Sequence, residues 1–129
     1  MNAFNIYFSV TLSGKTQTYK ATELKINKEM YRISFSSTDG NSLFYTVTIL
    51  SKEKVTFACV GEINYTFTLV EGKKSNFMLN LMGAPVDCEV YCSKLNVSII
   101  DNKIAVSGKY KLNAGSNISN FSFVIGGTL

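Results

Sequence analysis

Apolar and polar residues alternate along almost the whole chain, and this period of two constrains the fold more than any other feature. From 5 to 12, for example, Ile6, Phe8, Val10 and Leu12 are separated by Asn, Tyr, Ser and Thr. Because successive side chains of a strand point to opposite faces, this segment is predicted to be a half-buried strand. Apolar spacings of three and four are nowhere sustained, and only 21–30 leaves room for a helical turn. The pattern therefore predicts an all-β protein.

Alternating segments recur at short intervals, and residues that favour tight turns separate them, as in Ser13-Gly14 and Asp39-Gly40-Asn41. The segments are 5–12, 16–26, 31–35, 43–49, 55–59, 63–69, 77–81, 86–99, 104–112 and 118–125. About ten short strands with hairpin-length connections predict a meander. A meander that closes on itself has no exposed edge, so we predict a closed antiparallel up-and-down barrel of about 8–10 strands.

The segment from 86 to 99 changes the phase of its alternation. Its apolar residues occupy even positions up to Cys92 and odd positions from Leu95 onward. In a regular strand, this change of phase by one residue would point one of the two sets of apolar side chains outward into solvent. We therefore predict a β-bulge at Ser93-Lys94, because bulges re-aim strands and curve sheets into barrels. In the following segment, Gly108 is predicted to mark a second bend.

Length and composition predict a single domain, spanning 1–129. The chain has 129 residues, of which 46% are hydrophobic and 17% charged, and no linker divides it. Its first residues alternate and lack a basic start, which argues against an export signal. No apolar run approaches the ~20 residues that span a bilayer. The odd number of cysteines, Cys59, Cys88 and Cys92, indicates free thiols, so we expect a cytoplasmic protein without membrane contact.

The basic residues argue against a nucleic-acid partner. The net charge is +4, Arg32 is the only arginine, and the lysines near predicted turns are Lys15, Lys28, Lys52, Lys54, Lys73, Lys74 and Lys103. Dispersed lysines at strand ends typically keep a β protein soluble. Recognition of nucleic acid commonly relies on the bidentate contacts of arginine.

The residue types do not predict an enzyme. Without histidine, neither Ser-His-Asp nor Cys-His catalysis nor an imidazole metal site is available. Cys88 and Cys92 would lie about 13 Å apart along one strand face, too far for a disulfide or one tetrahedral metal. Asp87 and Glu89, about 7 Å apart, share the solvent face, where nothing apolar would raise a carboxyl pKa. We expect no catalytic residue, no metal and no cofactor.

Four tyrosines share the inner parity with aliphatic residues, and they are Tyr31, Tyr45, Tyr65 and Tyr110. A buried hydroxyl without a partner costs about 1–3 kcal/mol. Two arrangements follow. The hydroxyls either converge on the lumen and orient the polar end of a small apolar or amphipathic ligand, or lie at the barrel mouths in water.

The sequence leaves open whether the barrel is hollow or filled. Seven phenylalanines have the inner parity, and they are Phe8, Phe35, Phe57, Phe67, Phe77, Phe121 and Phe123. Each ring buries about 150–250 Å², so together they can fill much of a small barrel. A cavity of at least ~300 Å³ open to solvent would favour the ligand-binding hypothesis.

Apolar residues on the outer parity favour a different function. Phe44 and Leu50 lie on the solvent face of one strand, and Met78 and Met82 on that of another. A contiguous exposed apolar patch marks an interaction surface. The alternative is therefore a structural or protein-interaction module, including a homodimer, with a filled barrel and no ligand.

The order of turn and packing motifs in the second half of the chain also indicates a family. The motifs are Gly61-Glu62, Glu71-Gly72-Lys73-Lys74, Pro85, Ser93-Lys94-Leu95, Asp101-Asn102-Lys103-Ile104 and Tyr110-Lys111-Leu112. This order resembles the YwiB-like family of small uncharacterised bacterial proteins, most clearly from 55 to 125. The chain departs from the family at Cys59-Val60, where an Arg is common, and at 84–87, where Thr-Pro, an aromatic residue and Gly are common.

The resemblance implies a fold but no activity. Its motifs are turn and packing residues, and the family is known by a calycin-like β-barrel, a class that includes the lipocalins. Calycins often bind small apolar ligands inside the barrel, which is an analogy from fold alone. No catalytic residue carries over, because no activity is established for the family.

Overall fold

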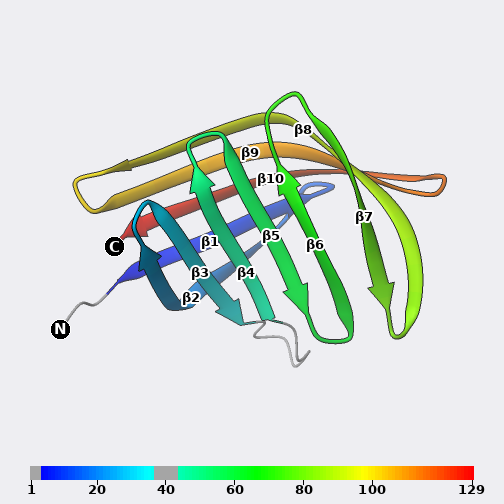
Figure 1. Cartoon of the computed structure of the whole chain (residues 1–129), viewed down its shortest axis with the longest axis horizontal. Helices are drawn as coiled ribbons and strands as arrows, with labels where there is room; N and C mark the ends of the chain where they lie inside the picture. Colours follow the sequence, from blue (N-terminus) through cyan, green and yellow to red (C-terminus); the bar gives the residue numbers. More distant parts are fainter. Residues whose placement is uncertain (1–3, 37–43) are drawn as a thin grey trace.

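The computed structural model describes residues 4–36 and 44–129, and these residues form a closed barrel of antiparallel strands without a helix (Figure 1). The strands are β1 (Asn5–Leu12), β2 (Lys15–Asn27), β3 (Met30–Ser36), β4 (Phe44–Ser51), β5 (Lys54–Val60), β6 (Ile63–Leu69), β7 (Lys74–Leu81), β8 (Ala84–Ile100), β9 (Lys103–Ala114) and β10 (Asn117–Thr128). Each strand pairs with its neighbour in sequence, and β1 pairs with β10 to close the barrel. The predicted up-and-down barrel is confirmed.

The segment that left room for a helical turn is instead a hairpin. β2 continues to Asn27 and β3 begins at Met30, so a tight turn joins them. Lys28 adopts the left-handed conformation in this turn, with φ of 59°. The predicted turn at 39–41, and Leu43 in the predicted fourth strand, lie outside the described residues.

The barrel has two walls that cross at a steep angle. Figure 1 shows β3, β4, β5 and β6 in front of β1, β8, β9 and β10. Three strands carry a register shift: β2 between Ala21 and Glu23, β4 between Ile49 and Ser51, and β8 between Cys92 and Lys94. The shift in β8 confirms the predicted bulge, and it keeps both apolar sets of this long strand on the inner face.

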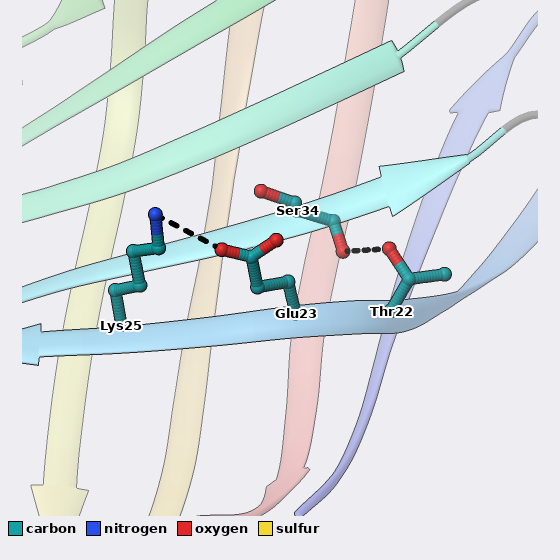
Figure 2. A network of polar contacts seen from close by, with 4 residues as sticks. All are labelled: Thr22, Glu23, Lys25 and Ser34. Carbon is teal, nitrogen blue, oxygen red and sulfur yellow. Dashed lines mark hydrogen bonds and ion pairs between the residues drawn. The ribbon is translucent and has the colours of Figure 1, made fainter.

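Polar side chains hold the outer side of the β2 bulge. Figure 2 shows Thr22 donating a hydrogen bond from its Oγ1 to the carbonyl oxygen of Ser34 on β3, at 3.2 Å. Next to it, Lys25 Nζ lies 3.1 Å from Glu23 Oε1, and both side chains are more than half exposed. The bond from the Thr22 side chain closes the gap that the extra residue leaves in the ladder. The exposed ion pair adds little stability.

The seam between β6 and β7 is the least regular part of the wall. The Cα register pairs only two positions there, Ile63 with Leu81 and Asn64 with Asn80. Farther along, the connection after β6 turns to β8 instead: Gly72 N donates to Cys92 O at 2.7 Å and Cys92 N donates to the Lys73 carbonyl at 3.2 Å. The seam therefore closes through a loop and the β8 bulge rather than through a full ladder.

The inner parity of the strands forms one apolar core. Of the seven inward phenylalanines, Phe77 and Phe121 are partly buried and the other five are buried. None of the described residues in the core is polar or charged. The barrel is therefore largely filled by side chains, as the ring count allows.

Gly108 makes room for one of these rings. β9 keeps its regular register with β10 through Gly108, and the bend expected there stays a prediction. A Cβ at this position would lie 2.7 Å from both the Phe123 ring and the Lys94 carbonyl oxygen. The glycine is needed because the ring of Phe123 lies against the bare backbone of β9.

We predict that Gly108→Ala destabilises the protein by about 1–3 kcal/mol, because the added methyl overpacks the core against a ring and a backbone oxygen. Gly126→Ala is the matched control on β10, since its nearest atom would be Ile104 O at 3.9 Å. We expect the control to change stability by less than about 1 kcal/mol. Urea unfolding followed by circular dichroism measures both, and equal stability of the two variants would contradict this account of Gly108.

Candidate functional site

Three of the four predicted tyrosines surround one cavity inside the barrel. Tyr45 on β4, Tyr65 on β6 and Tyr110 on β9 line a cavity of about 180 Å³, which we call the tyrosine pocket. The strand register explains this meeting, because Tyr45 and Tyr65 both pair with Cys59 on β5. Tyr110 belongs to the other wall, where it pairs with Phe121 on β10.

The sequence analysis missed two residues of the pocket, Gln17 and Tyr19 on β2. The Tyr19 hydroxyl donates to Gln17 Oε1 at 2.6 Å, and its ring lies 5.3 Å from that of Tyr45. β2 looked like a polar strand, so its inner row was not assigned. A two-residue turn at Ser13-Gly14 already sets the register, since it places Tyr19 opposite Phe8.

The rest of the pocket is mostly aromatic and aliphatic, and its described lining residues are uncharged. Tyr110 stacks on Phe121 with ring centroids 5.0 Å apart and meets Phe57 edge-on at 5.8 Å. Tyr65 stacks on Phe67 at 5.4 Å. Among the described residues that line the pocket, none is charged. A bound molecule would therefore have to be neutral, because a buried unpaired charge is costly.

The volume of the pocket is smaller than the sequence hypothesis required. Ligand pockets for drug-sized molecules usually enclose about 300–1,000 Å³, whereas the tyrosine pocket encloses about 180 Å³. That volume corresponds to the space of about six liquid water molecules. The filled core thus leaves room for a small molecule and excludes a long lipid chain from this pocket.

The hydroxyls of Tyr65 and Tyr110 give the pocket its hydrogen-bonding capacity. In the described part of the chain, no hydrogen bond reaches either hydroxyl. Neither oxygen is among the fully buried polar atoms that lack a partner, so both are open to a water-sized molecule. An unpartnered phenol in an apolar pocket costs about 1–3 kcal/mol. Both hydroxyls are therefore suited to a water or to a ligand acceptor.

Burial keeps these two phenols neutral. Loss of solvent raises the pKa of Tyr65 well above its ordinary value, and the nearby Cys59 and Tyr110 raise it further. Loss of solvent also raises the pKa of Tyr110. Each phenol therefore keeps its proton at neutral pH and can donate a hydrogen bond.

Tyr31 does not belong to the tyrosine pocket. On β3 it pairs with Ile49 of β4, four residues beyond Tyr45 along the same strand. It lines a separate hollow of about 440 Å³ with Ile49, Val97 and the β2–β3 turn. The four predicted tyrosines therefore separate into a group of three and a single residue near the opposite hairpins.

The three cysteines are free and buried, as the sequence analysis expected. Burial raises the pKa of each thiol. Protonated thiols are poor nucleophiles, so these side chains act as small core residues.

Asp87 and Glu89 lie on the outer face of β8, with Asp87 exposed and Glu89 half-buried. Glu89 Oε1 lies 3.7 Å from Lys74 Nζ and 3.5 Å from the side-chain nitrogen of Asn113. These contacts describe a solvated surface carboxylate paired with a lysine. They show no paired acid and base.

Several apolar side chains are exposed. Phe44 is 59% exposed, Leu50 39%, Met78 51% and Met82 84%. Met82 lies in the turn after β7 rather than on the strand, with a positive φ of 50°. Val60, which the sequence analysis did not single out, pairs with Phe44 on the outer face.

Comparison with known proteins supports the fold. No family model matches the chain, and no curated protein matches it. The chain is similar to the crystal structure of the YwiB protein from Bacillus subtilis, with a TM-score of 0.72 and 11% sequence identity over 98% of this chain and 92% of that chain. At this identity the likeness shows a shared fold, in agreement with the sequence resemblance. No helix in the described residues is long and apolar enough to cross a membrane.

We predict that the protein loses stability as pH rises above about 10, the ordinary pKa of tyrosine. The pKa values of Tyr65 and Tyr110 are raised in the folded chain. Their contribution to the free energy of unfolding is complete below the pKa of tyrosine in the unfolded chain. It is lost as pH rises from that value toward the pKa values in the folded chain. Urea midpoints measured between about pH 9 and 11 should fall, and fall less in a Tyr65→Phe/Tyr110→Phe variant. Ionisation of every tyrosine near pH 10 in the folded protein would contradict this assignment.

Proposed function

We propose that this chain is a non-enzymatic binding protein whose tyrosine pocket holds a small neutral molecule. One observation supports this proposal above the others: two neutral phenol hydroxyls, which have no hydrogen-bond partner among the described residues, are open to an uncharged, largely aromatic cavity of about 180 Å³. Such a cavity favours a ligand with one flat apolar part and one hydrogen-bond acceptor. Aromatic walls cover the apolar part, and the hydroxyls bind the acceptor.

The surrounding contacts support a preformed site. The rings of Tyr110, Phe121 and Phe57 pack on one another, and the Tyr19 hydroxyl is tied to Gln17. Side chains fixed in this way lose little conformational freedom on binding. The ligand displaces water from the pocket, and affinity increases only if its acceptor replaces the hydrogen bonds of that water.

Benzamide tests this proposal, because it combines a flat ring with one carbonyl acceptor. We expect it to bind with a dissociation constant on the order of 1 mM, as for a small fragment. Toluene lacks the acceptor and benzoate carries a charge, so both should bind more weakly. Saturation-transfer NMR detects all three.

Tyrosine variants locate the binding site. Tyr65→Phe and Tyr110→Phe should each weaken benzamide binding about three- to tenfold, because each removes one neutral hydrogen bond. Tyr7→Phe is the matched control, since Tyr7 is 43% exposed on the outer parity of β1. Equal affinity in all four proteins would refute the proposal.

The same experiments address the alternative function as an interaction module. Phe44 and Val60 are register partners on the outer face, and each is 59% exposed. An interaction module would bind none of the three probes and would sediment as a dimer. Substitution Phe44→Ser should then shift it toward monomer, because exposed apolar pairs stabilise association by leaving water.

A further inference from the structure

A basic hollow lies on the outer face of β8, β9 and β10, and nothing in the proposed function uses it. It encloses about 390 Å³, and its polar lining includes Lys109, Lys111, Ser93, Asn120, Ser122 and Tyr91. We call it the lysine hollow. The sequence analysis considered only the lysines near predicted turns and did not single out Lys109 and Lys111 on β9.

The strand register brings the positive charges together. Lys109 and Lys111 lie on the exposed face of β9, about 7 Å apart along the strand. Lys109 pairs with Lys94 on β8. The β8 bulge leaves both Ser93 and Lys94 exposed, so it adds a third lysine beside the hollow.

Neutral hydrogen-bonding side chains surround these lysines. Ser122 and Asn120 on β10 are the register partners of Lys109 and Lys111. On the other side, Tyr91 of β8 pairs with Lys111. Ser93 Oγ donates to the Lys109 carbonyl oxygen at 3.2 Å and fixes the bulge against β9. Ammonium groups next to hydroxyls and an amide can together bind the several oxygens of one anion.

Among the described residues, no carboxylate lines the hollow. The ion pairs of the described residues join Lys25 to Glu23 and Lys74 to Glu89, and Lys94, Lys109 and Lys111 take part in neither. Glu71, from the loop before β7, accepts the backbone N–H of Leu95 at 3.1 Å, beside Lys94 at the bulge, but it does not line the hollow. None of the described residues lining the hollow is acidic.

We propose that the lysine hollow binds a small phosphorylated molecule, with the phosphate on Lys109 and Lys111. A phosphate ester has several acceptor oxygens and a charge near −2, which matches two ammonium groups and adjacent neutral donors. The hydroxyl and amide side chains suit a polar remainder such as a sugar. A single-stranded nucleic acid fits less well, because it needs a longer basic track and several exposed stacking rings. Of the three aromatic residues that line the hollow, Tyr110 is buried and Phe121 packs against the core, which leaves Tyr91 on the outer face.

Glucose 6-phosphate, glucose and inorganic phosphate test the proposal. With ¹⁵N-labelled protein at low salt, glucose 6-phosphate should shift the backbone amides of 91–94, 107–111 and 120–123, and glucose should not. Shifts of the same amides on addition of inorganic phosphate would also support the site. The ratio of the affinities for glucose 6-phosphate and inorganic phosphate then measures the contribution of the sugar. Added salt should weaken binding, because these lysines are exposed.

Lysine variants provide the decisive comparison. Lys109→Gln and Lys111→Gln should each raise the dissociation constant of glucose 6-phosphate about tenfold. Lys54→Gln is the matched control, since Lys54 is exposed at the start of β5, away from these strands. Unfolding midpoints check that all three variants fold.

Three results would overturn the proposal. One is the absence of amide shifts with either phosphate, and another is equal weakening by all three lysine variants. The third is binding of a ten-nucleotide RNA with steep salt dependence when neither small phosphate binds, which would identify the face as a polyanion surface.

Discussion

Closure of the backbone ladder between β1 and β10 fixes the interior volume of the barrel, and every inward side chain has to fit that volume. An open sheet can relax an overfilled face by opening, but a closed one cannot without breaking hydrogen bonds. Strict alternation in each strand follows from this constraint, because one side chain in the wrong phase would bring a polar group inside. Of the three register shifts, those at Ala21/Glu23 and at Cys92/Lys94 let long strands turn between walls while keeping that phase.

The tyrosine pocket lies where the inner rows change from aliphatic to polar-tipped side chains. Around Phe35 and Phe123, which are almost completely buried, the interior is closely filled. On β2 the inner row instead carries Gln17 and Tyr19, which line the pocket. Polar tips need partners and therefore resist close packing with aliphatic groups. The small cavity is thus a consequence of residue type at one end of a crowded barrel.

The sequence predicted the fold closely, because alternation and turn residues act locally. The ten strands, the β8 bulge and the inward tyrosines on β4, β6 and β9 follow from parity alone. Which of these tyrosines meet was not predictable, because it depends on strand tilt and on the distance between walls. Tyr31 and Tyr45 share a parity but lie at different positions along paired strands. The packing role of Gly108 was not predictable for the same reason, since the ring that covers it comes from another strand.

The β8 bulge links the inside and the outside of the barrel. Without the extra residue, either the Leu95 side chain would point outward into solvent or the Lys94 side chain would point into the core. A buried lysine without a partner is costly. With it, Ser93 and Lys94 both remain outside, and Ser93 bonds the Lys109 carbonyl. On β9, Tyr110 points inward between Lys109 and Lys111, so one short stretch lines both the tyrosine pocket and the lysine hollow. A feature required for barrel closure therefore also arranges the basic outer face.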